Sequence, residues 1–303
     1  MDITNSIIHY RRSLKRRNYS PHTVKNYLNI LQQYIRWLDV PLEVASLKVI
    51  NSYIDFLMER RLHPKTINCH LECIRGFYDF IRYEENMNVS NPVRKGVTLR
   101  LPVPLPRYLK DEEVTLLFDA IKKRRDRAMF TLMLRCGLRV EEVANLTLGA
   151  LDLRRRRLIV HNGKGRKDRV VYISDDAFYT LKKYLLMRPR TKEKKIFLVE
   201  KGIYKDKGIS VRGIQKRMEY YAKKIRMKIS CHHLRHTMAT QMLNADAELS
   251  TIQDLLGHNW ITTTQRYCTV SNLKVQRDYF KAMEEVMQRS SPVSMKTHPP
   301  FQQ

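Results

Sequence analysis

The second half of this sequence carries cationic side chains and a tyrosine in an order suited to phosphodiester chemistry. In chain order the residues are Arg139, Lys164, His232, Arg235, His258 and Tyr267. Breaking a phosphodiester without a metal requires a nucleophile, cations that stabilise the charge on the non-bridging oxygens, and an acid for the leaving oxygen. Arginine suits the second task because its planar fork binds two phosphate oxygens and does not deprotonate. Together these residues predict a cleavage site built from side chains alone.

The arginines and the lysine lie next to residues that start or end secondary structure. Gly137 is expected to end one helix, which places Arg139 near the start of the next, where free N–H groups and partial positive charge favour a phosphate. Lys164 occupies the tip of an expected β-hairpin, from which its amine can reach a leaving oxygen. His232 and Arg235 are three residues apart, so on a helix they project from one face.

Each of these residues also has a plainer interpretation. Arg139 fits a surface arginine paired with Glu142, and Lys164 fits a basic hairpin that only touches backbone phosphate. His232 and His236 stand at the i, i+4 spacing of a metal-binding pair. The zinc-protease pattern, however, needs a glutamate directly after the first histidine, and this sequence has a second histidine there.

Tyr267 is the candidate nucleophile. Gly257 is expected to end a helix and to leave His258 in the following turn, and a short helix at 262–268 then carries the tyrosine. Tyrosine is unreactive near neutral pH unless a cationic site and a base activate it. Taken alone, a tyrosine nine residues after a histidine is more often part of a packed core than catalytic.

The overall charge points to a polyanionic partner. The 303 residues include 57 Lys+Arg and 30 Asp+Glu, a formal net charge of +27. A protein this far from neutrality repels itself unless it meets a polyanion, and nucleic acid is the most common one, although a solvated basic surface is the alternative. The length is enough for two domains.

The cysteine pattern and hydropathy predict a cytoplasmic protein. The five cysteines show no CxxC pair and an odd count, which indicates free thiols in a reducing compartment: Cys69, Cys73, Cys136, Cys231 and Cys268. We expect no signal peptide, because no apolar segment precedes a small-residue cleavage site near the start. We also expect no membrane span, because no stretch of about 18 apolar residues occurs.

The first 90 residues predict a helical bundle. Its first helix is expected to bury one apolar face, made by Ile7, Ile8, Tyr10 and Leu14. Ser20 and Pro21 are expected to cap and begin the next helix, and two more helices are expected at 46–60 and 64–83, the last starting at His63.

Prolines mark the end of the bundle. Asn91-Pro92 and the prolines after it favour extended backbone, which predicts a semi-rigid connector at 91–107. The connector separates a domain at 1–90 from a second domain at 108–289. The final residues, 290–303, are polar and proline-bearing and are expected to fray.

The second domain is expected to combine helices with a small sheet. Strands at 157–161 and 169–173 alternate around a glycine-containing turn and predict a hairpin. Asp111 is expected to cap the first helix of this domain. The helices are expected at 111–122, 125–135, 175–187, 211–226, 232–244, 248–256, 262–268 and 272–288. The fold class is therefore mainly α with a small β-sheet.

The ordered motifs resemble those of the tyrosine recombinase (phage integrase) family, with the Xer-like simple recombinases nearest in layout. The matching segments are Gly-Leu-Arg139-Val-x-Glu142, Gly-Lys164-Gly, His232-x-Leu-Arg235-His236-Thr, and Leu-Gly-His258 followed by Thr-Thr-x-x-Tyr267. The resemblance covers essentially the whole chain. It implies a four-helix-type, SAM-like core-binding domain followed by the α+β catalytic domain of the DNA breaking-rejoining fold.

The resemblance also implies a role for each matching residue. Tyr267 would form a 3′-phosphotyrosyl bond and release a 5′-hydroxyl, while Arg139 and Arg235 clamp the scissile phosphate. Lys164 would be the acid for the 5′ oxygen, and His232 the acid/base partner near the nucleophile. The remaining matches are a phosphate hydrogen-bond donor and two supporting residues, namely His258, Glu142 and His236. No ATP and no metal are expected, because the phosphotyrosine conserves the bond energy.

The implied partner is double-stranded DNA with specific core sites. Family members act as a homotetramer on two paired sites and exchange strands through a Holliday junction, some with a partner recombinase or accessory protein. The helix at 272–288 is expected to dock either on a neighbouring protomer or on the catalytic domain of its own protomer. The excess of basic over acidic residues and the expected lack of an arm-binding domain favour a role on a mobile element over a role in chromosome dimer resolution.

Two departures from the family pattern concern fine geometry rather than the reaction. Cys231 stands where relatives commonly carry proline, and Asn259-Trp260 replaces small residues. The competing hypotheses are a type IB topoisomerase-like enzyme, which would share the catalytic set, and a non-catalytic DNA-binding protein. A generic RNA-binding protein would explain the charge but not the ordered motifs.

Overall fold

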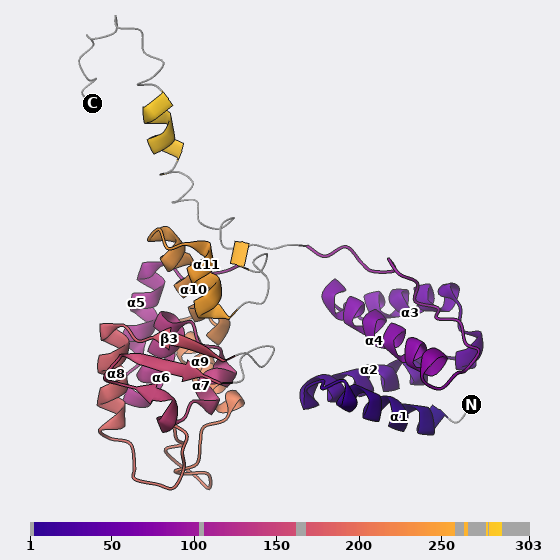
Figure 1. Ribbon diagram of the computed structural model, residues 1–303, viewed down its shortest axis with the longest axis horizontal. Helices are drawn as coiled ribbons and strands as arrows, with labels where there is room; N and C mark the ends of the chain where they lie inside the picture. The colour runs from indigo at the N-terminus through magenta and orange to yellow at the C-terminus, as the bar shows by residue number, and fades with distance from the viewer. Residues whose placement is uncertain are drawn as a thin grey trace, which may run out of the picture. The chain divides into compact units, whose positions relative to one another are not determined.

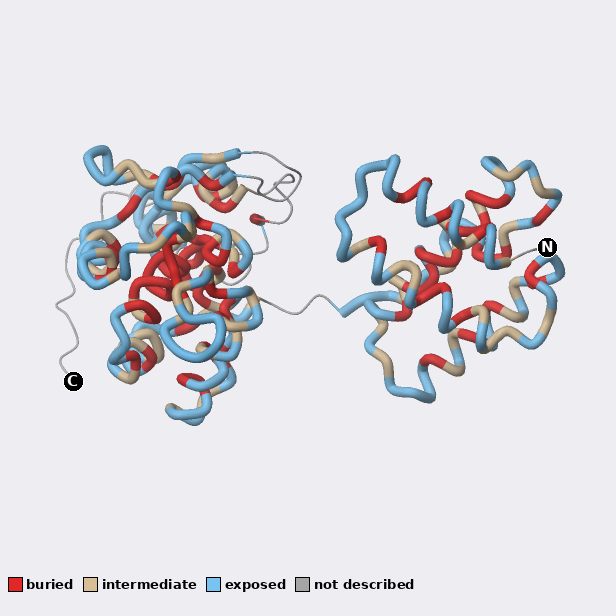
Figure 2. The backbone as a smooth tube through the Cα atoms, turned by 90° about the horizontal axis from the view of Figure 1, so that it is seen from below, coloured by how far each residue is buried: buried red, intermediate tan, exposed pale blue. Residues whose placement is uncertain are grey.

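A computed structural model shows the fold and describes residues 3–102, 106–161, 168–257, 264–265, 277 and 279–286. The chain divides into two compact units, Met1–Val103 and Pro104–Gln303, drawn as two sets of helices in Figure 1. Each unit closes a hydrophobic core of its own, seen as the buried interior of each in Figure 2.

The described part of the first unit is helical. Its elements are α1 (Ile3–Arg16), α2 (Pro21–Trp37), the 3-10 helix η1 (Leu42–Val44), α3 (Leu47–Glu59) and α4 (Pro64–Tyr83). The Ser20 hydroxyl accepts a hydrogen bond from the N–H of Thr23 at 3.1 Å, and Pro21 opens α2. His63 caps α4 in the same way by accepting from the N–H of Lys65. Both expected helix starts are confirmed.

The core of the first unit forms around α4, which packs against α1, α2 and α3. Tyr10 and Leu14 of α1 are buried there. The expectation that Ile8 shares their face is wrong, since Ile8 is 42% exposed. Residues 7, 10 and 14 follow the i, i+3, i+7 stripe of a helix, and position 8 lies about 100° away from position 7.

The segment after α4 belongs to the first unit. Val89 and Val93 are buried in its core. Further along, Leu99 exchanges two hydrogen bonds with the side chain of Asn68 on α4, at 2.8 and 2.9 Å. Arg75 of α4 also donates to the carbonyl of Val93 at 3.1 Å. Much of the sequence expected to be a connector is therefore packed against α4.

The second unit combines helices with one small sheet. Its elements are α5 (Asp111–Ala120), α6 (Arg124–Cys136), α7 (Val140–Asn145), η2 (Leu148–Ala150), β1 (Leu151–Asp152), β2 (Arg157–Val160), β3 (Arg169–Tyr172), α8 (Asp175–Leu185), α9 (Val211–Lys224), α10 (Cys231–Asn244) and α11 (Leu249–Leu256). Helix α6 is central and contacts α7, α8 and α10.

The sheet has the order β1-β2-β3, with both pairs antiparallel. Leu158 pairs with Val171, and both are fully buried, while Ile159 between Leu158 and Val160 is exposed. This alternation confirms the hairpin expected at 157–161 and 169–173. The sequence did not predict β1, which at two residues is too short to show alternation.

One expected helix cap is wrong. Asp111 is the first helical residue of α5, and Lys110 is the capping residue, whose N–H donates to the carboxylate of Glu113 at 2.9 Å. Asp111 instead places a negative charge in the first turn, which the helix dipole favours.

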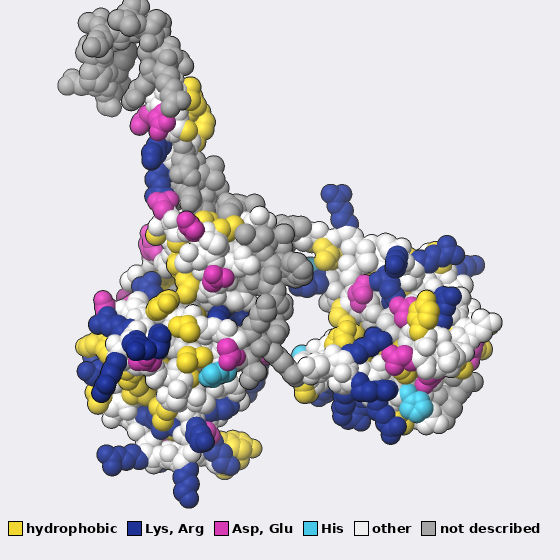
Figure 3. Space-filling model, in the orientation of Figure 1, with side chains coloured by type: hydrophobic (Ala, Val, Ile, Leu, Met, Phe, Trp, Pro, Cys, Tyr) yellow, Lys and Arg dark blue, Asp and Glu magenta, His cyan; other side chains and the backbone are white. Residues whose placement is uncertain are grey.

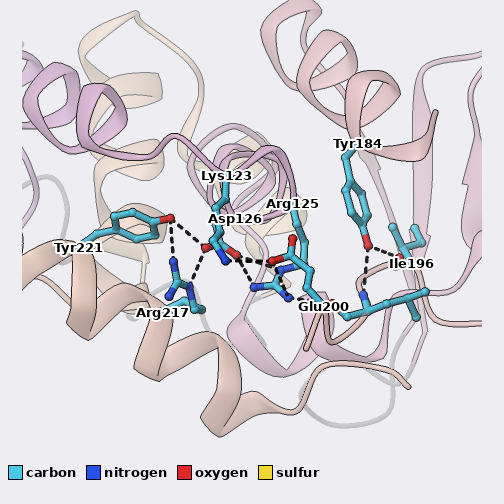
Figure 4. Close-up of polar contacts among 9 residues, drawn as sticks. Lys123, Arg125, Asp126, Tyr184, Ile196, Glu200, Arg217 and Tyr221 are labelled. Atoms are coloured by element: carbon cyan, nitrogen blue, oxygen red, sulfur yellow. Dashed lines mark hydrogen bonds and ion pairs between the residues drawn. The ribbon is translucent and has the colours of Figure 1, made fainter. Parts of the chain in front are cut away.

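A carboxylate is buried at the start of α6 (Figure 4). Asp126 is 0% exposed and accepts hydrogen bonds from Arg125, from Arg217 at 2.7 Å and from the Tyr221 hydroxyl at 2.9 Å. Arg125 continues to the carbonyl of Leu198 at 2.9 Å. Burial, together with the neighbouring Asp126 carboxylate, raises the pKa of Tyr221 to about 12. The cluster joins α6 to α9 and to the strand-like segment after α8.

The four described cysteines are free thiols, as expected: Cys69, Cys73, Cys136 and Cys231. The fifth, Cys268, lies outside the described residues. Within the described ranges, no helix has the length and apolar character needed to cross a bilayer.

Candidate active site

The site begins where α6 gives way to α7. Gly137 follows α6 with a φ of 62°, the left-handed conformation that glycine adopts without steric cost. Arg139 is the residue that precedes α7, so the prediction that it lies at a helix start is confirmed. Its backbone N–H donates to Glu142 at 2.7 Å and its Nη1 donates to the same carboxylate at 2.8 Å.

The second predicted arginine comes from α10. Arg235 is only 4% exposed, and its guanidinium donates to the carbonyl of Gly137 and to that of Leu256 at the end of α11. These bonds bring together the end of α6, the first turns of α10 and the end of α11.

The end of α11 also receives Arg139. Gly257 ends the helix with a φ of 61°, as its sequence position predicted, and its carbonyl accepts from Nη2 of Arg139 at 3.2 Å. The carbonyls of Leu256 and Gly257 are successive in the chain, so the guanidinium groups of Arg139 and Arg235 meet at one place. The fold thus joins two residues that are 96 positions apart in the sequence.

A third arginine, which sequence reasoning missed, completes this cluster. Arg169 begins β3 and donates to both oxygens of Glu142, at 2.7 and 2.8 Å, and to the carbonyl of Leu255 at 2.8 Å. Its side chain is 8% exposed. In the sequence Arg169 is one basic residue among 57, at the edge of a hairpin, and no spacing distinguishes it.

Glu142 is ionised by its surroundings. Burial alone would raise its pKa, but hydrogen bonds and positive charge from Arg169 and Arg139 outweigh that effect and lower the pKa to about 2. Its side chain is 6% exposed. Three arginines against one carboxylate leave this part of the unit positive, which suits an anionic ligand.

Two of the three predicted histidines, His232 and His236, lie on α10. His232 lies in the first turn of α10 with part of its side chain exposed, and its pKa is lowered first by desolvation from neighbouring protein atoms and then by the charges of Arg235 and Arg139. Its ring centroid is 6.5 Å from that of His236, one turn further along. Across the described ranges, no three His, Cys, Asp or Glu side chains gather as they would around a metal ion.

Three predicted site residues, Lys164, His258 and Tyr267, lie outside the described residues, as does most of the helix expected at 262–268. Within that expected helix, Thr264 and Gln265 are helical and Thr264 is buried. The described part of the helix expected at 272–288 is helical at 277 and 279–286, with Tyr279 and Phe280 more than half exposed.

Basic side chains are scattered over the visible faces of both units (Figure 3). On α1, the side chains of Arg11, Arg12 and Lys15 are exposed. Arg17, just after α1, instead has an acidic partner within the chain, since it pairs with Glu84 at 2.7 Å. Two of the four consecutive arginines at 154–157 also have acidic partners: Arg156 pairs with Asp175, and Arg157 pairs with Asp152.

The arrangement can bind and polarise a phosphate. Two guanidinium groups with fixed main-chain contacts are preorganised donors, and preorganisation stabilises charge that develops on phosphate oxygens in the transition state. A histidine whose pKa is lowered by desolvation and by nearby cations is more often neutral, and a neutral imidazole can accept a proton.

Comparisons with known proteins agree with this chemistry. Residues 107–273 match the phage integrase family, and residues 8–85 match the N-terminal SAM-like domain of phage integrases. A tyrosine recombinase XerC of Thermodesulfovibrio yellowstonii is 32% identical over 96% of this chain and 96% of its own length. A tyrosine recombinase XerA of Thermococcus kodakarensis is 29% identical over 88% of this chain and 92% of its own.

Solved structures share the fold. A Tn1549 transposon integrase in complex with transposon right end DNA aligns with a TM-score of 0.74 at 18% identity, over 92% of this chain and 99% of that one. A lambda integrase dimer bound to a core site aligns with a TM-score of 0.72 at 16% identity, over 89% of this chain and 77% of that one. The fold class expected from sequence is confirmed. The chain therefore belongs to the phage integrase family and is a tyrosine recombinase, an enzyme that cleaves and rejoins DNA at specific sites.

Proposed function

We propose that this recombinase cleaves DNA through Tyr267 and that Arg139 and Arg235 hold the scissile phosphate. The observation that carries the proposal is the convergence of both guanidinium groups on successive carbonyls at the end of α11, directly before His258 in the chain. Two cationic forks at one place can bind both non-bridging oxygens of a single phosphodiester.

The reaction divides into two balanced transfers. The Tyr267 hydroxyl attacks phosphorus, the bond to the 5′ oxygen breaks, and Lys164 gives that oxygen a proton. A 5′-hydroxyl of the exchanged strand then attacks the phosphotyrosine and passes its proton back to Lys164, and the bond between phosphorus and the tyrosine oxygen breaks. His232 takes the tyrosine proton in the first transfer and returns it in the second, and its lowered pKa supports the acceptor role. His258 donates a hydrogen bond to the phosphate.

Glu142 and His236 act through other residues. Glu142 accepts from both the backbone and the side chain of Arg139, so it fixes where that guanidinium lies. His236 stands one helical turn after His232, with its ring 6.5 Å away, and limits the orientations open to that imidazole.

The two domains divide the work of binding. The helical domain at 1–90 contacts the core site, the segment at 91–107 joins it to the catalytic domain at 108–289, and the residues at 290–303 form a tail. Exposed basic residues such as Arg11 and Arg12 contribute salt-dependent contacts to the DNA backbone. The assembly is a homotetramer on paired double-stranded sites in the cytoplasm, to which a partner recombinase or an accessory protein could also contribute.

The substrate is a mobile element that the enzyme integrates, excises or resolves. The formal charge of +27 supports this choice, since a strongly basic surface favours association with DNA. Chromosome dimer resolution is the other role. Mapping the DNA sites that the protein binds in the host distinguishes the two roles. A mobile-element recombinase should bind sites at the ends of the element, and a dimer-resolving recombinase should bind a site near the chromosome terminus. The named relatives are recombinases, which does not favour a topoisomerase-like activity.

The catalytic assignment is tested with a duplex selected from a randomised library by its binding to the full-length protein. A nick near the cleavage position lets the released fragment diffuse away, so the covalent product accumulates. On a denaturing gel, without ATP and with a metal chelator, wild type should give a protein–DNA band and Tyr267→Phe should not. A band from Tyr267→Phe, or no band from wild type on bound DNA, would falsify the assignment.

A further inference from the structure

The last carbonyls of α11 each receive a different arginine. Three successive acceptors have one donor each, in the order Leu255 with Arg169, Leu256 with Arg235 and Gly257 with Arg139. The C-terminal carbonyls of a helix have no partner within the helix, and cations favour this end of the dipole. The end of α11 therefore acts as a fixed template that spaces three guanidinium groups.

Arg169 has a second set of contacts that links it to Arg139. Its two terminal nitrogens each bond to one oxygen of Glu142, at 2.7 and 2.8 Å. Of those oxygens, Oε1 also accepts from Nη1 of Arg139 and Oε2 accepts from the N–H of Arg139. Arg169 thus shares with Arg139 every acceptor oxygen of Glu142.

The packing around Arg169 depends on a glycine. A Cβ placed on Gly257 would lie 3.0 Å from Cδ of Arg169 and 3.3 Å from its Nη1. The φ of Gly257 is also positive, at 61°. The turn that presents the Gly257 carbonyl to Arg139 therefore has the one residue type that leaves room for Arg169 beneath it.

We propose that Arg169 is a positioning residue that sets the Arg139 guanidinium for the scissile phosphate; this rests on the proposed role of Arg139. Arg169 fixes both supports of Arg139 at once: the Glu142 carboxylate directly, and the Gly257 carbonyl through its own bond to the end of α11. In this proposal Arg169 acts on the phosphate only through Arg139, because each of its three guanidinium nitrogens already donates to Glu142 or to the carbonyl of Leu255.

A purely structural salt bridge would make different predictions. Loss of a stabilising contact lowers the folded fraction and reduces every activity together. Loss of a positioning contact leaves DNA binding intact and slows the chemical step, because a displacement of about 1 Å costs on the order of 100-fold in rate. It also leaves the salt dependence of binding unchanged. An arginine that contacts a phosphate would instead add about −0.9 to the slope of the logarithm of the binding constant against the logarithm of the salt concentration.

The test compares Arg169→Ala and Arg169→Lys with Arg212→Ala. Arg212 is a matched control, since it also pairs with a glutamate on the second unit, Glu219 at 2.8 Å, but is 64% exposed. Binding is measured as a Kd at several salt concentrations on the library-selected duplex, and cleavage is measured in a single turnover on its nicked form. Circular dichroism and thermal unfolding establish the folded fraction at the assay temperature.

We expect Arg169→Ala to bind with the wild-type salt slope and to cleave about 100-fold more slowly. Arg169→Lys keeps a positive charge beside Glu142 but lacks the planar guanidinium, so its cleavage rate should lie between those of wild type and Arg169→Ala. It replaces the alanine variant in the test if that variant does not fold. Arg212→Ala should match wild type. Wild-type cleavage on the same gel shows that the proposed function holds, so its absence would be a failure of that proposal and not of this one.

A substrate with an uncharged phosphate gives the decisive readout. Replacing one non-bridging oxygen at the cleavage position by methyl removes the charge that Arg139 stabilises, so a defect in positioning Arg139 should matter less. We expect the ratio of wild-type to Arg169→Lys rates to shrink by about tenfold on this methylphosphonate, an effect worth about 1.4 kcal/mol. An equal ratio on both substrates, or wild-type cleavage by both Arg169 variants, would overturn the proposal.

Discussion

The guanidinium of Arg139 donates to the carbonyl of Gly257 at 3.2 Å, across 118 residues of sequence. Gly257 can present that carbonyl because it ends α11 in the left-handed conformation. The position of a residue proposed to hold the phosphate therefore depends on backbone geometry at a helix end and not only on its own side chain.

Gly257→Ala tests this dependence. A non-glycine residue at a φ of 61° is strained, and its Cβ would stand 3.0 Å from Cδ of Arg169, so we expect a loss of about 1–3 kcal/mol of stability and slower cleavage. Urea unfolding and single-turnover cleavage measure the two effects. Gly149→Ala is the control, since a Cβ there meets nothing within 4 Å and its stability should stay within about 0.5 kcal/mol of wild type. Equal effects of the two substitutions would contradict the argument.

Glu142→Gln should show a stability cost that depends on pH. The pKa of Glu142 is about 2 in the fold against an ordinary 4.5. A depressed folded pKa contributes stability that is present above the unfolded value and lost as pH falls toward the folded one. We expect a cost of about 3 kcal/mol near neutral pH that shrinks steadily below pH 4.5. Denaturant titrations of both proteins across this range measure it, and a pH-independent gap would contradict the electrostatic origin.

Asp126→Ala should destabilise the second unit. Its removal leaves Arg125 and Arg217 without their shared carboxylate, and breaking a buried ion pair by removing one partner costs about 3–5 kcal/mol. The comparison is Glu219→Ala, which breaks an exposed pair with Arg212 and should cost about 0–1 kcal/mol. Urea unfolding followed by far-UV circular dichroism gives both values. If the two variants were equally stable, the buried network would contribute nothing beyond a surface pair.

The pH profile of cleavage should report His232. Burial and the charges of Arg235 and Arg139 lower its pKa below the ordinary 6.5, so it is neutral near pH 7 and able to accept a proton. Glu141 acts in the opposite direction. We expect the cleavage rate to fall as pH decreases through this lowered pKa, because protonation removes the base. His232→Asn should be slower by about 10²–10⁴-fold and lack the inflection. His9→Asn, on the exposed face of α1, should retain both the rate and the profile.

Local sequence signals were enough for most of the secondary structure. The capping serine before Pro21, the two glycines that end α6 and α11, and the alternation in β2 and β3 each act within a few residues. Such signals do not depend on the rest of the fold, and this is why the starts and ends that they predict are confirmed. Asp111 was misplaced because a cap and a first-turn acid favour the same residue types one position apart.

The contacts of the site could not be read in the same way. The family resemblance implied that Arg139 and Arg235 act as a pair, and the structure shows them meeting at the end of α11. The sequence did not indicate Arg169 or the Asp126 cluster, because both depend on elements brought together from distant parts of the chain. In a protein so rich in arginine, residue type alone does not distinguish a buried, bonded side chain from a solvated one.

Separate hydrophobic cores have a consequence for how such proteins diversify. The cluster that contains Tyr34 and Phe77 and the cluster that contains Phe130 and Leu158 draw their residues from different halves of the chain. A substitution that repacks one cluster does not require a compensating change in the other. Chimeras joined near residue 103 are therefore expected to fold, so that one half could be inherited or engineered for a new DNA sequence while the other keeps its chemistry unchanged.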